Sequence, residues 1–231
     1  MEERISKWEV YQLSNKDKII KRDIIKEEDI KYVGGLDISF DKKDENNACA
    51  YLTIYDITTN KIVYEDYYLC KMTIPYISGY LGFREIPHYK KLLDRIVDNE
   101  FYPQILLVDG SGILHKSEFG SASHLGYVVD IPTIGVAKTL LSHDGLRERE
   151  IKQKFREKCN RKGDYIELKG DSGALWGLAL QSCKIVERPI YITIGHKISL
   201  ETAKNIVLKS CVYKNPEPIR NSDIKSKLYF N

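Results

Sequence analysis

The sequence lacks the features of a secreted, disulfide-bonded or membrane-spanning protein. Its five cysteines are an odd number, lie far apart in 231 residues and form no Cys-x-x-Cys pair. This spacing excludes a zinc ribbon and argues against a disulfide framework. The longest runs without a polar side chain, such as Leu125–Val129 and Gly173–Leu180, are far shorter than a membrane span. Residues 1–29 contain no apolar segment of a secretory signal.

A large excess of charge of one sign is also missing. The chain has 36 basic and 33 acidic residues, a net charge of +3, and 42% of its residues are hydrophobic. Such a chain can bury a sizeable core and is not disordered as a whole. We expect one soluble, monomeric domain over residues 1–231, with residues 1–29 as an N-terminal helical extension. The expected location is the cytoplasm, with access to the nucleus left open.

Residues 31–74 have the β-branched and tyrosine-rich composition of strands. A short polar break at residues 58–60 predicts that the second and third of them form an antiparallel hairpin. The predicted strands are Tyr32–Phe40, Ala48–Ile57 and Ile62–Met72.

The pattern then changes to the period of a helix. Four apolar side chains share one helical face: Tyr89, Leu92, Leu93 and Ile96. Pro87 is predicted in the first turn of this helix. The apolar run Ile105–Val108 predicts a strand buried on both faces, and a helix over 118–130 and a strand Thr133–Ala137 follow. This order predicts an α/β fold with a mixed sheet, an antiparallel three-strand half plus parallel strands, flanked by helices.

The C-terminal part adds a hairpin around 164–194 and a helix from Ser199, its N-cap, to Val212. A basic helix is predicted near 145–161, because eight basic and three acidic residues alternate with apolar ones over 147–162. A solvated surface helix explains this charge as well as a contact with a polyanion does.

Two carboxylates are poorly explained by the core. Asp37 lies within an apolar strand, and Asp109 ends the apolar run at Ile105–Val108. A buried carboxylate needs hydrogen bonds or a cation, although a turn before Gly110 would also explain Asp109. In a sheet of this order, the first and fourth strands are expected to be neighbours. The two acids would then lie together and favour Mg²⁺, with Mn²⁺ as a substitute.

Other polar residues carry no chemistry by themselves. Glu85 is explained as an acid near a helix N-terminus, and Asp223 as a surface charge. His115 and His124 match no zinc spacing. The Gly170–Gly173 segment resembles the nucleophile loop of trypsin-like proteases, but those enzymes are secreted and disulfide-bonded.

Seven blocks run in order from about residue 30 to residue 225: Gly35–Phe40, Pro75–Glu85, Val108–Gly112 with His115, Gly120–Gly126, Pro132–Lys138, Gly195–Ser199 and Pro216–Arg220. In their order and spacing they resemble the signature blocks of the endonuclease V family. The resemblance implies a ribonuclease-H-like fold, in agreement with the predicted strand order. It also implies an Mg²⁺-dependent nuclease that recognises inosine. Such an enzyme cuts the second phosphodiester bond on the 3′ side and leaves 3′-hydroxyl and 5′-phosphate ends.

The resemblance also assigns roles to residues. Asp37, Glu85 and Asp109 match the metal-binding carboxylates of the family. Asp223 falls where bacterial members carry His or Asp and eukaryotic members carry Asp. Two further matches are to residues near the scissile phosphate: His115 and Lys138.

The substrate-binding residues follow in the same way. Pro75, Tyr76, Ile77 and Ser78 match the wedge that enters the strand beside the lesion, and Ser78 replaces a bacterial proline, which makes the wedge less rigid. The positions that match the hypoxanthine pocket are Gly79, Leu81, Gly110, Gly120, Ser121 and Leu141.

The expected partner is single-stranded RNA that contains inosine. Ser78, Asp223, the basic segment and the Gly170–Gly173 block are similar to eukaryotic members, which prefer inosine in RNA. Two alternatives stay open: a DNA repair endonuclease of the same fold that acts on deoxyinosine or structured DNA, and a non-catalytic protein that binds inosine RNA.

Overall fold

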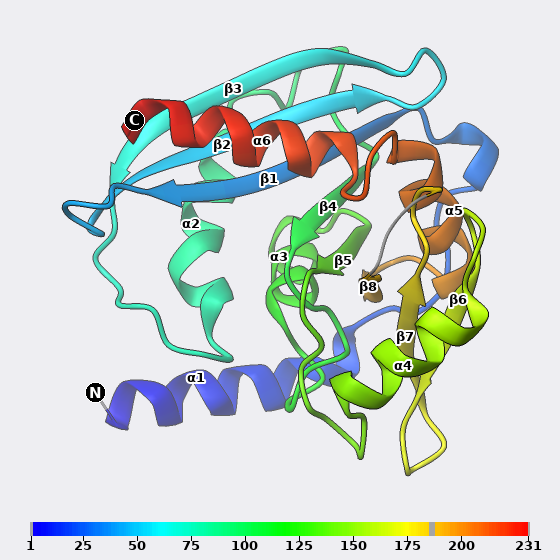
Figure 1. Ribbon diagram of the computed structural model, residues 1–231. Helices are drawn as coiled ribbons and strands as arrows, with labels where there is room; N and C mark the ends of the chain where they lie inside the picture. Colours follow the sequence, from blue (N-terminus) through cyan, green and yellow to red (C-terminus); the bar gives the residue numbers. More distant parts are fainter. Residues whose placement is uncertain (1, 185–187, 231) are drawn as a thin grey trace.

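The structure is a computed structural model and describes residues 2–184 and 188–230. Within these residues the strands are β1 (Tyr32–Phe40), β2 (Asn47–Asp56), β3 (Lys61–Lys71), β4 (Ile105–Asp109), β5 (Thr133–Ala137), β6 (Tyr165–Lys169), β7 (Leu175–Leu180) and β8 (Ile190–His196). They form one open sheet in the order β3-β2-β1-β4-β5-β8-β7-β6 (Figure 1).

The sheet is mixed, as the sequence predicts. β1, β4 and β5 are parallel neighbours, and antiparallel strands extend the sheet on both sides of them. The predicted hairpin of β2 and β3 is confirmed. The hairpin predicted around 164–194 is present as β6 and β7, and β8 extends it as a third antiparallel strand that also pairs with β5.

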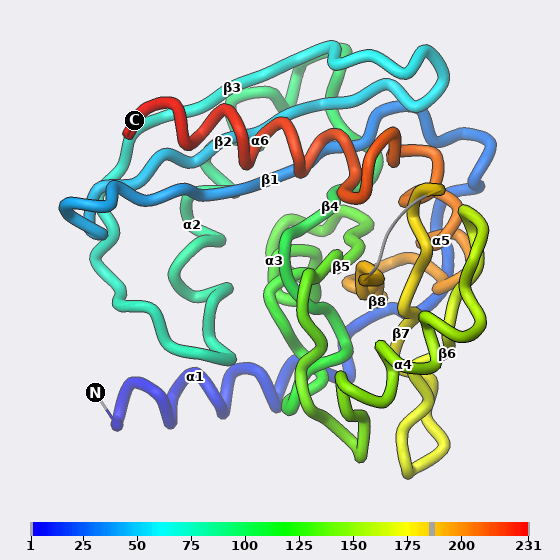
Figure 2. The backbone as a smooth tube through the Cα atoms, viewed as in Figure 1, coloured from blue at the N-terminus to red at the C-terminus, as the bar shows by residue number. Residues whose placement is uncertain are grey.

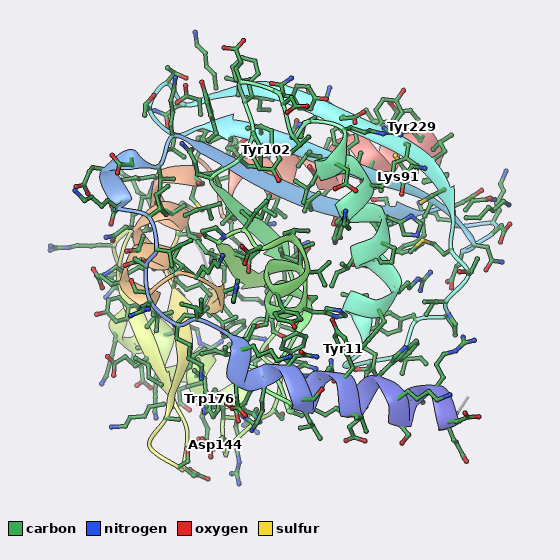
Figure 3. The ribbon with its side chains drawn as sticks, turned by 180° about the vertical axis from the view of Figure 1, so that it is seen from behind. Tyr11, Lys91, Tyr102, Asp144, Trp176 and Tyr229 are labelled. Carbon is green, nitrogen blue, oxygen red and sulfur yellow. The ribbon has the colours of Figure 1, made fainter. Side chains whose placement is uncertain are left out.

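Helices flank the sheet: α1 (Glu2–Asn15), α2 (Leu81–Asp94), α3 (Ser121–Val129), α4 (Glu148–Lys158), α5 (Leu200–Ser210) and α6 (Glu217–Lys227), with single 3₁₀ turns at η1 (Lys16–Lys18), η2 (Glu27–Asp29) and η3 (Leu228–Phe230). Figures 1 and 3 show α2 and α6 on opposite faces of β1 to β3. None of the helices in the described residues is long and apolar enough to cross a membrane.

The alternation of side chains along β4 divides the core into two layers. Leu106 and Val108 pack with the apolar residues of α2 and α3, whereas Ile105 and Leu107 belong to the cluster on the other face. Successive side chains of a strand point to opposite faces, so a strand covered on both sides is apolar throughout. The central strands are therefore held firmly at the point where they carry Asp37 and Asp109.

The start of α2 differs from the prediction. The helix begins at Leu81, so Pro87 lies inside it and Glu85 is not in its first turn, contrary to both expectations. An internal proline removes a hydrogen bond to the carbonyl of the preceding turn. The helix persists because its inner face, including Ile86 and Tyr89, is buried against the sheet.

The sequence analysis assigned no helix to residues 217–227, which form α6. This helix packs on β1 and β2 and is held there by buried serines: Ser222 Oγ donates to the Gly35 carbonyl at 3.0 Å. A Cβ atom at Gly35 would lie 2.2 Å from the carbonyl carbon of Pro218. Gly35 therefore lets α6 approach β1 and bring Asp223 over the sheet.

The N-terminal segment is α-helical only over α1, which lies along the body of the protein below α2 and α3 (Figure 2). Trp8 stacks on Phe83 with ring centroids 4.8 Å apart, and Tyr11 contacts Phe83, Phe119 and His124. Figure 3 shows Tyr11 on the side of α1 that faces α2 and α3. α1 is thus an integral part of the structure around residues 79–124.

Candidate active site

Asp109 is the last residue of β4, and Asp37 lies in the adjacent β1 at the point where its parallel pairing with β4 ends. The register pairs Leu36 of β1 with Val108 of β4, so the two acids follow directly on neighbouring strands. The expectation that these strands are neighbours is confirmed. Carboxyl ends of parallel strands are where α/β sheets gather polar side chains for chemistry.

Asp37 is buried, and hydrogen bonds from neighbouring hydroxyl groups stabilise its negative charge only weakly. Burial, with the neighbouring Asp109 and Asp223 charges, raises its pKa from 3.8 to about 7. Its Oδ2 atom lies 3.3 Å from the Ser226 hydroxyl of α6 and 3.5 Å from that of Ser39. These hydroxyls orient the carboxyl group without neutralising it.

Glu85 reaches the same place from α2. Burial raises its pKa from 4.5 to about 8, and the charges of Asp37 and Asp109 act in the same direction. The Tyr89 hydroxyl donates a hydrogen bond to Glu85 Oε2 at 3.0 Å and partly opposes this rise. The three carboxyl groups predicted to act together are therefore within electrostatic reach of one another.

Asp223 approaches from α6 on the Asp37 side. It is partly buried and accepts a hydrogen bond from Lys227 at 2.6 Å. The interpretation of Asp223 as an isolated surface charge is wrong, because its charge raises the pKa of Asp37.

We call the four carboxyl groups of Asp37, Glu85, Asp109 and Asp223 the acidic centre. Its oxygen donors are of the kind that a hard divalent cation prefers. Among the residues that the structure describes, no three or more His, Cys, Asp or Glu side chains are gathered closely enough to form a metal cage. Carboxylate oxygens are nevertheless the ligands that Mg²⁺ and Mn²⁺ prefer. The pKa values of Asp37 and Glu85 are raised first by burial and then by the crowding of the neighbouring acids, and a cation would relieve both costs.

Lys138 supplies a positive charge beside Asp109. Its Nζ donates to Asp109 Oδ2 at 2.7 Å. Burial lowers the pKa of Lys138, but the attraction and hydrogen bond of Asp109 outweigh burial, so its pKa is raised and it stays protonated. The ammonium group therefore lies beside the acids as a fixed positive charge.

A cavity of about 310 Å³ opens next to Asp109. Its volume is at the lower end for ligand pockets, a size suited to one base. The predicted residues that line it are Tyr76, Ser78, Gly79, Leu81, Asp109, Gly110, His115, Ser121, Lys138 and Leu141. Three further lining residues were not predicted, because their only sequence signal is that they flank predicted positions: Ser111, Ala137 and Thr139.

Three predicted substrate residues do not line this cavity: Pro75, Ile77 and Gly120. Gly120 lies behind the wall, since a Cβ there would come within 2.4 Å of the Ser111 carbonyl oxygen. Gly110 lies in the wall itself, and a Cβ would come 2.2 Å from Ser121 Oγ. Both glycines let the walls come together, but only Gly110 faces the space.

His115 is held in the cavity wall by a buried polar chain. Its Nδ1 accepts a hydrogen bond from the Ser117 N–H at 3.3 Å, and Ser117 Oγ donates to Gln12 Oε1 at 3.1 Å. Burial, followed by the charge of Lys116, lowers the pKa of His115 to about 4. The imidazole is therefore neutral, and its Nδ1 atom also lies 2.7 Å from Ser117 Oγ.

Gln12 was not predicted from the sequence. Its Nε2 donates to the carbonyls of Gly79 at 3.0 Å and Phe119 at 3.1 Å, so α1 joins the two segments that flank the cavity. A single glutamine in a charged helix carries no sequence signal of such a role.

A model of the endonuclease V family matches residues 14–224. The chain belongs to the endonuclease V family. It is 39% identical to endonuclease V of Homo sapiens over 98% of this chain and 83% of the human protein. Members of this family are nucleases that usually need a divalent metal, so the chain is a hydrolase and the acidic centre is its candidate metal site.

Solved endonuclease V structures share the fold. The catalytic domain of human endonuclease V has a TM-score of 0.94 at 38% identity and covers 99% of this chain and 96% of the human one. Endonuclease V of Ciona intestinalis, in complex with a 23mer DNA containing an inosine followed by a ribo-adenosine, has a TM-score of 0.95 at 32% identity. That comparison covers 100% of this chain and 98% of the Ciona one.

Proposed function

We propose that the protein is an Mg²⁺-dependent endonuclease that recognises inosine in single-stranded RNA. It cuts the second phosphodiester bond on the 3′ side of the inosine and leaves 3′-hydroxyl and 5′-phosphate ends. The observation that carries this proposal is the connection between the base-sized cavity and the acidic centre. Asp109 lines the cavity and is the strand neighbour of Asp37.

The cavity reads a base that has left the stack. Gly110 and Ser121 form a close-fitting wall, and the neutral imidazole of His115 is a further polar group in it. A base must be everted before its edge can be read in such a space. Tyr76, whose side chain is 64% exposed, can stack into the position that the base vacates.

The chemistry belongs to the acidic centre. Asp37, Glu85 and Asp109, with Asp223 beside them, would hold a divalent cation, which supplies Lewis acidity at the phosphate when bound. The protonated Lys138 offsets charge that develops on the phosphate oxygens. Burial of Asp37 and Glu85 excludes water that would otherwise screen these charges.

RNA is favoured over DNA by the residues that are similar to eukaryotic members, Ser78 and Asp223. The ribo-adenosine that follows the inosine in the Ciona complex is compatible with a ribose beside the scissile bond. The DNA strand of the same complex keeps deoxyinosine DNA as the second candidate substrate.

Matched oligonucleotides test the proposal. Inosine RNA should be cut with Mg²⁺ but not with EDTA, its adenosine counterpart should stay intact, and deoxyinosine DNA should be cut more slowly. Equal cutting of inosine and adenosine RNA would refute inosine recognition, and faster DNA cutting would select the second candidate. Asp37→Ala should abolish cutting and retain binding, which distinguishes an enzyme from a non-catalytic binder.

A further inference from the structure

A second cavity, of about 500 Å³, lies on the other side of the acidic centre. Six of the side chains that line it combine charge and aromatic surface: Asp37, Phe40, Lys42, Asp223, Lys227 and Phe230. They come from the end of β1, the turn after it, α6 and η3. Figure 1 shows the C-terminal end of α6 beside the turn between β1 and β2. We call this cavity the exit groove.

The cavity of about 310 Å³ next to Asp109 is called the base cavity here. The exit groove and the base cavity share none of their described lining residues. They meet at the acids, because Asp109 lines the base cavity and its strand neighbour Asp37 lines the exit groove. A nucleic-acid strand that places a base in one cavity and a phosphate at the acids must continue toward the other.

The composition of the exit groove suits a nucleotide. Lysine side chains neutralise phosphates, and aromatic rings stack with bases of any sequence. Lys42 is exposed, whereas Lys227 is paired with Asp223 at 2.6 Å. The Phe40 ring is held in place by the Arg84 guanidinium, 4.4 Å from its centroid, and Phe230 is partly buried. Two lysines and two phenylalanines line the exit groove, so it suits a ligand with both a negative and an apolar part.

We propose that the exit groove binds the nucleotide immediately 3′ of the scissile bond, with its base against Phe230 and its backbone phosphate near Lys42. This inference rests on the proposed function, which places the cut on the 3′ side of the inosine. The same nucleotide carries the new 5′-phosphate after cleavage. The exit groove therefore holds the downstream product until it is released.

A double-mutant cycle, in which Phe230 and one base of the substrate are altered separately and together, tests the contact between them. The substrate is inosine RNA, and its variant has an abasic residue in place of the first base 3′ of the cut. In the wild-type protein this change should raise KM about tenfold, the size of one lost base stack, with kcat nearly unchanged. In Phe230→Ala the intact substrate should already show the higher KM, and the abasic substrate should add nothing. Phe230→Tyr should restore the wild-type response.

Matched controls use neighbours outside the exit groove. Lys42→Glu should raise KM for the intact substrate, whereas Lys43→Glu, an exposed lysine in the same turn, should not. Tyr229→Ala should leave the abasic effect intact. The inference is overturned if the wild type is insensitive to the abasic residue, or if Phe230→Ala stays as sensitive as the wild type. Loss of the inosine-to-adenosine preference in the wild type would instead overturn the proposed function.

Discussion

Asp37 and Glu85 are placed for function at the expense of stability. Both are buried, and their pKa values are raised to about 7 and about 8. A group whose pKa is raised on folding binds protons more tightly in the folded state, so its unfavourable contribution is greatest above that pKa. Without a cation, these two groups should make the protein more stable as the pH falls from about 8 toward 6.5. Below that pH the buried histidines His115 and His124, whose pKa values burial lowers to about 4, act in the opposite direction.

Removing either charge should stabilise the metal-free protein and abolish cleavage. Asp37→Asn should raise the free energy of unfolding at pH 8 by about 4 kcal/mol, because its pKa is raised from 3.8 to about 7 and each unit corresponds to about 1.4 kcal/mol. Its gain at pH 5 should be much smaller. Urea unfolding in EDTA at both pH values measures this difference. Glu65→Gln, a change at a carboxyl outside the acidic centre, serves as the control. A variant less stable than wild type at pH 8 would contradict the crowding of charge described above.

Gln12 shows how a residue remote in sequence can hold the base cavity. Gln12→Ala should remove two donors from buried carbonyls and the acceptor for Ser117, at about 1–3 kcal/mol for each group left unpaired. We expect kcat on inosine RNA to fall about tenfold or more. Gln12→Glu keeps the acceptor and loses the donors, so it should recover only part of the activity.

The comparison that decides the role of Gln12 is with Leu13→Ala, a change at an exposed residue of the same helix. Leu13→Ala should leave cleavage and unfolding near wild type. If Gln12→Ala shifts only the unfolding midpoint and cleaves normally when folded, α1 has no part in positioning His115.

At the scale of elements, Gly35 sets the distance between β1 and α6. Gly35→Ala forces a Cβ against the Pro218 backbone, which cannot rotate away. Overpacking of this kind destabilises by about 1–3 kcal/mol, and the displaced α6 carries Asp223 with it. Thermal unfolding and cleavage should both fall. Gly34→Ala meets mainly the Leu106 side chain, at 2.7 Å, so its effect should be smaller. Equal effects of the two variants would mean that the α6 contact does not limit this site.

The elements that could be predicted are those whose hydrophobic pattern in the sequence also determines their position in the fold. β1, β4 and β5 read as strands because their apolar runs are buried on both faces, and this order made Asp37 and Asp109 neighbours. α6 was missed because it buries Ser222 and Ser226 as well as apolar residues, so no apolar period marks it. The start of α2 was missed because tertiary packing overrides Pro87.

The residues of the candidate active site were likewise predictable only where the sequence pattern also placed their element in the fold. Glu85 and Asp223 have surface explanations when the sequence is considered alone, and only the resemblance to the endonuclease V family assigned them. The structure brings them to Asp37 through α2 and α6, two elements that the strand pattern does not place. The exit groove was not predicted at all, because it forms where the end of β1 meets the last turn of the chain.

For the whole molecule, the near balance of charge means that attraction to nucleic acid must be local. α4 buries Ile151, Phe155 and Cys159 beside it, as predicted, and turns its basic side chains outward. It follows the segment that carries Lys138 and Leu141 of the base cavity. An exposed basic face so near the site can guide a polyanion toward it by charge alone.

Reversing two charges of that face should weaken binding without changing recognition. Lys154 and Lys158 are exposed and take part in none of the salt bridges of the described residues. The double variant Lys154→Glu and Lys158→Glu should bind inosine RNA more weakly at 50 mM salt and show a shallower dependence of affinity on salt. At 500 mM salt the two proteins should converge, because the Debye length there is only about 4 Å. The ratio of inosine to adenosine cleavage should stay at the wild-type value, since the base cavity is untouched.

Reversal of Lys7 and Lys26, both exposed on the N-terminal segment, makes the same change in net charge away from this face. An equal loss of affinity in that control would show that net charge, and not the face of α4, attracts the substrate.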